Sequence, residues 1–585
     1  MVKMTNKLRL YLLCLLSIIT IILLITSCST DSTSDPNSET LSTDIIPNET
    51  SLTIFESGEY NCVIVIPHKA PTDVENAAYS LSLNMSKVTP GISPLVVSDK
   101  EYDGKDTSGD NMILIGKTSI KGTEETFANS KYGAVYTQLI GNKFQVLIND
   151  SKSAACFNEK IKKIIGSSAV PSITIDESWN FSETVDEMMS TIEVYDGGYV
   201  DSTVDCGDGT FMKVIKNTSP EDYKAYIQKS KVAGGLLYSE NTIGNNLFTT
   251  MTYDGYNATF VHLGNLKESR LIIEPSDNFC LPELEKENTY TVICDTSVTQ
   301  VGGEKDNIQN GMGYIFKLAD GRFVIIDGGH EANYIVNKTL DTLRELAEDP
   351  NEIVIAAWFI THLHDDHFGM MKRMSKKEDI GIYIERIIYN LPDDKFLNAS
   401  YEADGKPVTD GIAEIRNIAS ELMNQHKENG TKIYKAHPGQ VYHLANMDFT
   451  IYSTTELYAP IEGVIFNNTS VVIRATVEGQ SLLFPGDSGK IQSKTTINIY
   501  GKELKSDFLQ LIHHGAGGGD TDYYELVDPQ ILFWPAGMTS YEKTYSKDYN
   551  EYFFREEGTS LKETHIAGDK VITIPLPYDK VTKAD

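Results

Sequence analysis

The feature that most constrains this chain is the run His362-Leu-His364-Asp-Asp366-His367, which follows an apolar stretch from Ile353 to Ile360. In an extended loop the side chains of His362 and His364 project to the same side, so both imidazoles can reach one cation. Asp366 and His367 then turn into the helix expected after the run and face a second position. The run therefore predicts a buried strand that ends in a metal centre.

Three further apolar stretches also end in polar side chains that can bind metals. The clusters that follow them are Asp327-Gly-Gly-His330, Pro485-Gly-Asp487 and His513-His514. Ligands gather at the carboxyl ends of buried strands, where a rigid sheet gives way to loops. Ten of the twelve histidines fall between His330 and His565. We therefore expect the four strand ends to meet and to bring their imidazoles and carboxylates together.

The residue types restrict the cation. The chain has no cysteine after Cys294, so a metal in this region must be bound by histidine and carboxylate ligands. Such ligands suit Zn²⁺, and also Mn²⁺ or Fe²⁺. Asp487 comes from a separate strand and could bridge two cations about 3.5–4 Å apart. The sequence thus predicts a cofactor of one or two divalent metal ions, with Zn or Mn expected first.

This block of motifs resembles the metallo-β-lactamase superfamily, whose HxHxDH motif is matched at every defined position, over roughly residues 290–578. The resemblance implies an αββα sandwich in which Asp327 orients the site, Asp487 bridges the metals and the His513-His514 pair supplies the last histidine ligand. LLFPGDSG followed by LQLIHHGAGG is most similar to the branch containing the soluble domain of bacterial competence DNA-uptake proteins. Assigned enzymes of that branch are chiefly phosphodiesterases or nucleases.

The sequence departs from the superfamily at the third motif, which is normally a histidine ahead of the bridging aspartate. His426, His437 and His443 are available by their order in the chain, but none ends an apolar stretch. The branch has an asparagine-rich segment there, and this chain has Asn467-Asn468-Thr-Ser470. Asn468 is therefore a candidate weak oxygen ligand or substrate contact, and a mononuclear or exchange-labile centre stays open.

These considerations give a set of candidate site residues. The predicted metal ligands are His362, His364, Asp366, His367, Asp487 and His513. Asp366 and His514 are the predicted catalytic groups. His514 would donate a proton to the leaving group if His513 binds metal, and the reverse assignment of the two histidines stays open. Asp327, His330 and Asn468 are expected to support the site, whereas Asp365 and His565 are expected at the surface.

The first residues resemble an export signal. Lys3, Lys7 and Arg9 precede an uncharged apolar run from Leu10 to about Thr26. The run ends in Ile-Thr-Ser-Cys28, which resembles a bacterial lipobox. We predict a lipoprotein signal peptide over residues 1–27, a flexible Ser/Thr-rich tether over 28–50 and anchoring to the outer face of a bacterial membrane. The alternative is an uncleaved signal anchor.

Two smaller modules are expected between the tether and the metal domain, which spans residues 288–585. Residues 51–190 alternate strand and helix patterns, and the helix followed by MILIGKT is similar to small α/β accessory domains ahead of some glycoside hydrolases. Residues 191–287 predict an α+β module with a helix that begins at Ser219 and an antiparallel meander. His68 and His262 lie alone in apolar strands and are expected to be structural. The fold class is therefore multidomain α/β, with a C-terminal αββα sandwich preceded by two smaller α+β modules.

The net charge of −31 bears on the substrate. A surface that acidic repels long polyanions, so long nucleic acid is disfavoured as a partner. The sequence predicts a metal-dependent hydrolase that cleaves a small or cell-wall-linked phosphoester. Two alternatives stay open: a β-lactam or thioester hydrolase, and a non-catalytic surface lipoprotein whose N-terminal modules contact glycan.

Overall fold

The structure is a computed structural model that describes residues 51–120, 131–284, 290–303, 311–377, 380–391, 417–418, 430–459 and 466–582. The expected signal peptide and tether lie outside these residues, so the predictions for them are not tested. Among the described helices, none has the length and apolarity needed to span a membrane.

The first module contains a six-stranded sheet in the order β4-β3-β5-β7-β6-β9 and a small sheet β2-β1-β8. Its strands are β1 (Leu52–Glu56), β2 (Glu59–Tyr60), β3 (Val63–Ile66), β4 (Val96–Ser98), β5 (Met112–Ile115), β6 (Ala134–Ile140), β7 (Lys143–Leu147), β8 (Ser172–Ile175) and β9 (Phe181–Thr184). Its helices are α2 (Thr72–Val88) and α4 (Ser151–Ile165). Strands and helices alternate over much of the module, as predicted, and β6 and β7 form a hairpin whose turn contains Gly141 at a φ of 57°.

The second module is a six-stranded antiparallel sheet, β10-β11-β15-β14-β13-β12, with one long helix. Its elements are α5 (Glu187–Ser190), β10 (Tyr199–Asp205), β11 (Phe211–Lys216), α6 (Pro220–Val232), β12 (Leu236–Ile243), β13 (Asn246–Tyr253), β14 (Tyr256–Leu263) and β15 (Glu268–Pro275). Ser219 caps α6 as predicted, and a capping box with Asp222 completes the start of the helix. β10 and β12 are edge strands with few buried side chains, so no apolar pattern predicted them.

The C-terminal part contains two sheets. The first has the order β22-β21-β19-β18-β17-β16-β30, with β20 also paired to β19, and the second has the order β23-β24-β25-β26-β27-β28-β29. The strands of the first sheet are β16 (Thr296–Val301), β17 (Gly313–Lys317), β18 (Phe323–Asp327), β19 (Ile353–Phe359), β20 (Ile382–Ile384), β21 (Arg386–Tyr389), β22 (Lys432–Lys435) and β30 (Val571–Leu576). Those of the second are β23 (Val441–Leu444), β24 (Met447–Ser453), β25 (Val472–Val477), β26 (Gln480–Phe484), β27 (Phe508–Gln510), β28 (Ile531–Trp534) and β29 (Glu563–Ile566).

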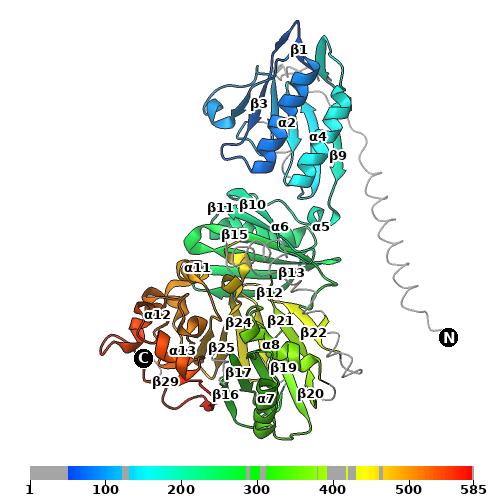
Figure 1. Cartoon of the computed structure of the whole chain (residues 1–585). Helices are drawn as coiled ribbons and strands as arrows, with labels where there is room; N and C mark the ends of the chain where they lie inside the picture. The colour runs from blue at the N-terminus through cyan, green and yellow to red at the C-terminus, as the bar shows by residue number, and fades with distance from the viewer. Residues whose placement is uncertain are drawn as a thin grey trace, which may run out of the picture. The chain divides into compact units, whose positions relative to one another are not determined.

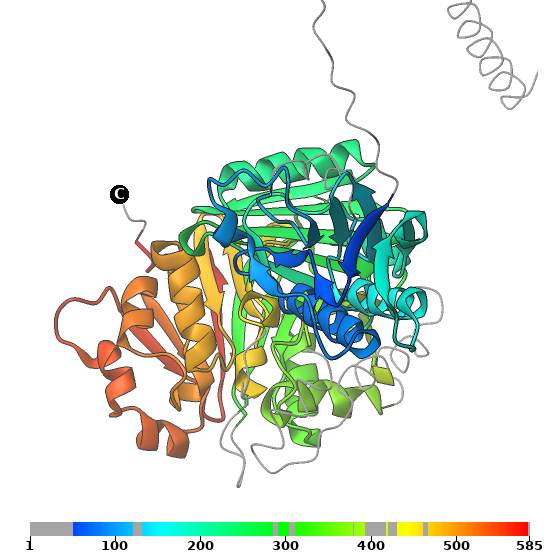
Figure 2. The ribbon, with the colours of Figure 1, turned by 90° about the horizontal axis from the view of Figure 1, so that it is seen from above.

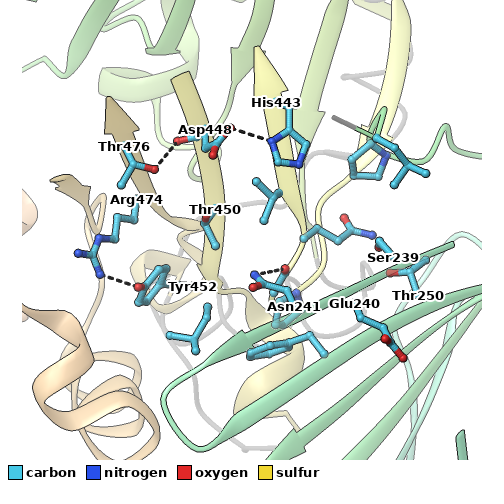
Figure 3. A pocket seen from close by; sticks show the side chains of 18 of the residues that line it. Ser239, Glu240, Asn241, Thr250, His443, Asp448, Thr450, Tyr452, Arg474 and Thr476 are labelled. Carbon is cyan, nitrogen blue, oxygen red and sulfur yellow. Dashed lines mark hydrogen bonds and ion pairs between the residues drawn. The ribbon is translucent and has the colours of Figure 1, made fainter. Parts of the chain in front are cut away.

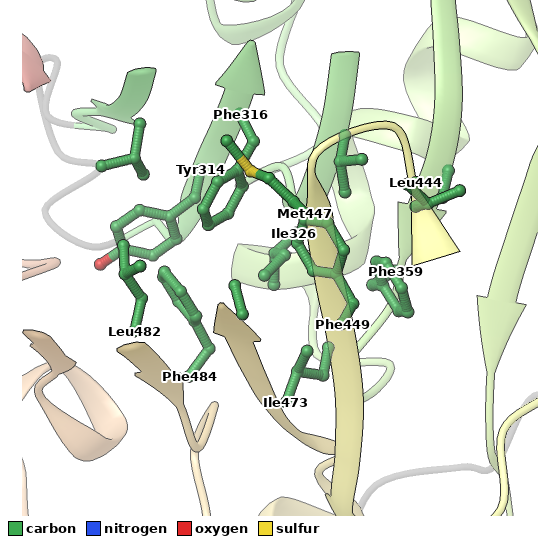
Figure 4. Close-up of a cluster of buried hydrophobic side chains, with 14 of the residues drawn as sticks. Tyr314, Phe316, Ile326, Phe359, Leu444, Met447, Phe449, Ile473, Leu482 and Phe484 are labelled. Carbon is green, nitrogen blue, oxygen red and sulfur yellow. The ribbon is translucent and has the colours of Figure 1, made fainter. Parts of the chain in front are cut away.

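The two sheets pack face to face through large apolar side chains (Figure 4). Phe316 of the first sheet meets Phe449 and Phe484 of the second edge-on, with ring centroids 5.3 and 5.6 Å apart. Helices cover the outer faces: α7 (Asn333–Leu346) and α8 (Asp365–Ser375) pack on the first sheet, and α11 (Lys490–Tyr500) and α12 (Thr521–Val527) pack on the second. Figures 1 and 2 show the orange helices α11 and α12 on one side of the strands and the green helix α8 on the other. A further helix, α13 (Met538–Thr544), follows β28. The predicted αββα sandwich is confirmed.

The sandwich also explains why polar residues follow these strands. β18 pairs with β19 in parallel, and β26 pairs with β27 in parallel, so the carboxyl ends of each pair open at one edge of their sheet. All four strands are almost completely buried along their length. They therefore form a rigid base that carries the four polar clusters.

Candidate metal centre

Three of the four strand ends, those after β19, β26 and β27, bring six potential ligands into two groups. His362, His364 and Asp487 form one group, and Asp366, His367 and His514 form the other, with the ligand atoms of each group within 4.8 Å of one another. All except His364 and Asp366 are buried. The structure thus joins residues that are more than a hundred positions apart in the sequence.

Asp487 lies between the two groups. Its Oδ1 is 3.1 Å from His367 Nε2, and its Oδ2 is 3.6 Å from His514 Nε2 and 3.9 Å from His362 Nε2. His514 Nε2 is also 3.1 Å from Asp366 Oδ2. One carboxylate therefore faces both groups, as expected of a bridging ligand.

The backbone fixes this carboxylate closely. Gly486 has a φ of 59°, and a Cβ at that position would lie 3.0 Å from Cβ of Thr361. Glycine therefore allows the loop after β26 to pass beside the start of the histidine motif, which places Asp487 next to His362 and His367.

The imidazoles of His362, His367 and His514 are buried, and the Nδ1 atom of each contacts a polar group of the protein. Asp327 lies 2.8 Å from His367 Nδ1 and also accepts hydrogen bonds from the backbone N–H and the hydroxyl of Thr361. His514 Nδ1 lies 2.6 Å from the carbonyl oxygen of Pro535. His362 Nδ1 lies 3.2 Å from the Thr361 hydroxyl. Contacts of this kind orient the Nε2 atoms towards a cation.

Burial and neighbouring charge set the protonation of these histidines in the absence of a cation. Burial lowers the pKa of His362 well below its usual value, and the neighbouring His367 and His364 lower it further. Burial alone would also lower the pKa of His367, but Asp487 and Asp327 raise it well above its usual value. A cation that binds to His367 would therefore displace the proton that this imidazole carries.

The residues present fit a divalent cation. Asp487 Oδ1 is buried without a hydrogen-bond partner, and its contact with His367 lacks hydrogen-bond geometry. The Nε2 atoms of His367 and His514 face each other at 3.2 Å. Imidazole nitrogens and carboxylate oxygens therefore converge on the same space. Such a set of ligand atoms suits Zn²⁺ or Mn²⁺.

Strained backbone is concentrated at the same place. Asp327, His513 and His514 have φ values of 56°, 51° and 54°, in the left-handed region that non-glycine residues rarely adopt. Each such residue costs about 1–3 kcal/mol and persists only where the surrounding structure imposes it. The strain at all three positions fits a site whose geometry is set by function.

The structure distinguishes between His513 and His514, whose roles the sequence left open. His514 is the one that belongs to a ligand group. The side chain of His513 is one-third exposed, its Nε2 lies 3.2 Å from Asn467 Nδ2, and it is 3.8 Å from Asp487 Oδ2. The geometry therefore favours the reverse of the assignment preferred from sequence, with His514 as ligand and His513 on the open side of the site.

The third-motif position is filled by the asparagine-rich segment, but not by Asn468 as a ligand. Asn468 Oδ1 accepts a hydrogen bond from the backbone N–H of Gln492 at the start of α11. The Ser470 hydroxyl of this segment lies 3.4 Å from His362 Nδ1. The side-chain oxygen of Asn468 is thus engaged at the start of a helix, which disfavours a role as metal ligand, and a substrate contact by Asn468 stays a prediction.

The spare histidines lie elsewhere. His437 is held between Glu274 and Glu456, and His443 pairs with Asp448. His426 lies outside the described residues. Among the residues that the structure describes, no third histidine joins His362 and His364.

His330 and Asp365 stand together at the rim of the site. His330 Nδ1 lies 3.0 Å from Asp365 Oδ2, and the Asp365 side chain is 62% exposed. Neither belongs to a ligand group. Asp365 is thus at the surface, and a supporting role for His330 stays a prediction.

Sequence reasoning missed two of the groups that hold the imidazoles. The Pro535 carbonyl is a backbone group, so no residue type in the sequence indicates that it contacts His514. The Thr361 hydroxyl had a signal, since Thr361 stands directly between the buried strand and the first histidine of the motif.

The fold and the donor set together define an αββα protein with a histidine–carboxylate metal centre. Residues 311–516 match the family model of the metallo-beta-lactamase superfamily, so this part of the chain is similar to members of that superfamily. No curated protein matches the chain.

Several solved structures resemble the chain. The metallo-beta-lactamase fold protein YhfI from Bacillus subtilis is 14% identical, with a TM-score of 0.28, over 48% of this chain and 100% of that one. CmlA, a diiron beta-hydroxylase from Streptomyces venezuelae, is 12% identical, with a TM-score of 0.30, over 52% of this chain and 55% of that one. Zn²⁺-bound PqqB from Methylobacterium extorquens is 10% identical, with a TM-score of 0.24, over 37% of this chain and 72% of that one.

A separate cavity of about 470 Å³ lies between strands β12 and β13 and the outer face of β23, β24 and β25 (Figure 3). Its lining includes His443, Asp448 and Thr450, which point outward from the second sheet, whereas the alternate residues point into the core. None of the six potential metal ligands lines it. This cavity is therefore distinct from the metal centre.

Proposed function

We propose that the protein is a metal-dependent hydrolase that cleaves a phosphoester outside the cytoplasm, anchored to a membrane by its N-terminus. The observation that carries the hydrolase assignment is the position of Asp487, whose two oxygens face both ligand groups. When bound there, divalent cations would supply Lewis acidity and a nucleophile at neutral pH. The anchoring rests on the residues around Cys28 alone.

The chain's own residues divide the remaining work. Asp327 fixes the tautomer and orientation of His367, and the Pro535 carbonyl does the same for His514. His513 is the exposed histidine beside Asp487, and burial lowers its pKa. A neutral imidazole at that position can hydrogen-bond the leaving oxygen of a substrate as its bond to phosphorus breaks.

Two observations support a phosphoester as the substrate: the sequence motifs that follow β26 and β27, and the net charge of the chain. The GDSG and HHG motifs resemble the branch rich in phosphodiesterases, and two adjacent cation positions suit the several oxygens of a phosphoryl group. The net charge of −31 opposes a long polyanionic substrate. A small or cell-wall-linked phosphoester is therefore the proposed substrate.

The proposed hydrolase function can be tested directly in the ligand group formed by His362, His364 and Asp487. Replacing His364 by alanine removes one of three ligands from that group, and we expect hydrolysis of bis-p-nitrophenyl phosphate with Mn²⁺ or Zn²⁺ to fall at least roughly 100-fold. The matched change His565→Ala, at a histidine that pairs with Glu563 in β29, should leave the rate unchanged. Activity that survives His364→Ala would refute the proposed function.

The two rival activities are measured with the same preparation. Turnover of nitrocefin or lactoylglutathione, without turnover of the phosphodiester, would replace the phosphoester assignment by a β-lactam or thioester hydrolase. Absence of turnover with every metal and substrate would favour a non-catalytic surface protein.

A further inference from the structure

The first module contains a cavity of about 550 Å³ that is separate from the metal centre. It opens at the carboxyl ends of β3, β4, β5 and β7, which run parallel to one another. Segment 194–200 at the start of the second module closes one side of it. The volume lies within the range of roughly 300–1,000 Å³ that is typical of small-molecule sites.

The position of the cavity in the sheet favours a ligand site. From β3 the chain passes through α2 to β4 on one side of β3, and then returns to β5 on the other side. The loops after β3 and β5 therefore diverge and leave a crevice between them. Ligands of open α/β sheets bind at such topological switch points.

The crevice is built around a buried carboxylate. Asp99, 5% exposed, accepts hydrogen bonds from the backbone N–H of His68 at 2.6 Å and of Ser119 at 2.8 Å. It thereby ties the loop after β3 to the loop after β5 and keeps the crevice open. His68, expected in an apolar strand, instead lies in the turn after β3 and lines the cavity.

One lining group lacks a partner among the described residues. The Thr118 side chain is only 7% exposed, and no described residue forms a hydrogen bond with its buried hydroxyl. Buried hydroxyls are nearly always hydrogen-bonded in folded proteins, because an unpaired one costs the free energy of its desolvation. Thr118 therefore indicates a polar group that enters the crevice from outside the chain.

The charges of the lining identify the chemistry of that group. Lys69, Lys100 and Lys117 share the lining with the carboxylates of Asp73, Asp99, Asp103 and Asp196. A phosphate or another plain anion would face four carboxylates, and Asp73 stands in the first turn of α2, where an anion would otherwise bind best. A simple cation would face three ammonium groups. The ligand must donate and accept hydrogen bonds at many points, which a polyhydroxylated ring does.

Aromatic and apolar groups complete the crevice. Tyr199 lies beside Lys69, whose Nζ is 5.3 Å from the centre of the ring, and Val74 and Pro67 add apolar surface. Lys117 is held by the carbonyl oxygen of Asp196 at 3.2 Å. We propose that this crevice binds a saccharide unit, which would place the hydrolase domain near a glycan.

Binding is tested by titration calorimetry on the full chain with N-acetylglucosamine and chitobiose, and with inorganic phosphate and glycine as probes of the other charge classes. We expect a sugar to bind and the two other probes to fail. Thr118→Val, which removes one hydroxyl at constant shape, should weaken sugar binding roughly 3- to 10-fold, the effect of one hydrogen bond. Ser119→Trp, at an exposed position of the rim, should fill the crevice and abolish binding.

Two controls make the result specific. Ser167→Trp places the same side chain after the far end of α4 and should bind sugar like the wild type. His364→Ala should also bind sugar unchanged, so that failure of the hydrolase proposal and failure of this one are distinguishable. Absence of sugar binding, sugar binding that Ser119→Trp leaves intact, or binding of phosphate or glycine in place of sugar would overturn the proposal.

Discussion

Asp487→Asn is expected to lower hydrolysis on the order of 10³-fold and to remove both cations from the chain. The two oxygens of this buried carboxylate face both ligand groups, and its Oδ1 makes no hydrogen bond with the residues that the structure describes. The amide keeps the shape but removes the negative charge and offers one donor nitrogen in place of an acceptor. Loss of metal catalysis removes several kcal/mol of transition-state stabilisation, at about 1.36 kcal/mol for each tenfold in rate.

The matched control is Asp341→Asn, the same change at a side chain that is 68% exposed on α7 and pairs with Arg344. It should change neither the metal content nor the rate. An Asp487→Asn chain that keeps two bound cations, or loses less than tenfold in rate, would contradict a bridging role for Asp487.

A second large effect is expected for His437→Gln, which should destabilise the protein by about 3–5 kcal/mol. His437 Nδ1 lies 3.0 Å from Glu456, and Nε2 lies 3.1 Å from Glu274 of β15, so the imidazole joins the second module to the C-terminal sandwich. All three side chains are at least 96% buried. The uncharged amide leaves two buried carboxylates without a cation between them.

The pH dependence of this effect has a definite sign. Burial alone would lower the pKa of His437, but Glu456 and Glu274 raise it from 6.5 to about 10. Its contribution is therefore complete below pH 6.5 and is lost as the pH rises towards 10. Burial raises the pKa of Glu456, but His437 lowers it below 4.5, so the contribution of Glu456 is complete above pH 4.5 and is lost as the pH falls. The difference in stability between wild type and His437→Gln should be largest between about pH 4.5 and 6.5.

Urea denaturation at several pH values measures this difference. His443→Gln serves as the control, since its partner Asp448 is half exposed and the pair should contribute at most about 1 kcal/mol. Equal stability losses for the two variants, or a loss at His437 that grows towards pH 10, would show that the buried ion pairs do not hold the modules together.

The sequence predicted those parts of the site that have a local pattern. His362, His364, Asp366 and His367 stand in one short motif after a buried strand, and Asp487 and the His513-His514 pair also end apolar stretches. The αββα sandwich was implied by the resemblance of these motifs to the metallo-β-lactamase superfamily. The N-cap of α6 at Ser219 was equally visible, because capping depends on neighbouring residues.

Features set by contacts across the fold were not predictable from local patterns. Asn468 looked like a ligand by its position in the chain, but the start of α11 takes its side chain. The choice between His513 and His514 depends on two successive left-handed residues that turn His514 inward. His437 resembled a spare metal ligand, and one of its two carboxylate partners, Glu274, comes from an element 163 residues away in the sequence.

The most direct test of the metal centre is the count of cations bound by the purified chain after dialysis against Zn²⁺ or Mn²⁺, measured by inductively coupled plasma mass spectrometry. We predict two cations per chain. The one held by His362, His364 and Asp487 should leave first on chelation, because the described residues give that group no third histidine. Phosphodiester hydrolysis should disappear with the cations and return when they are restored. A chain that binds no cation, or that hydrolyses the ester equally well after complete chelation, would contradict the account.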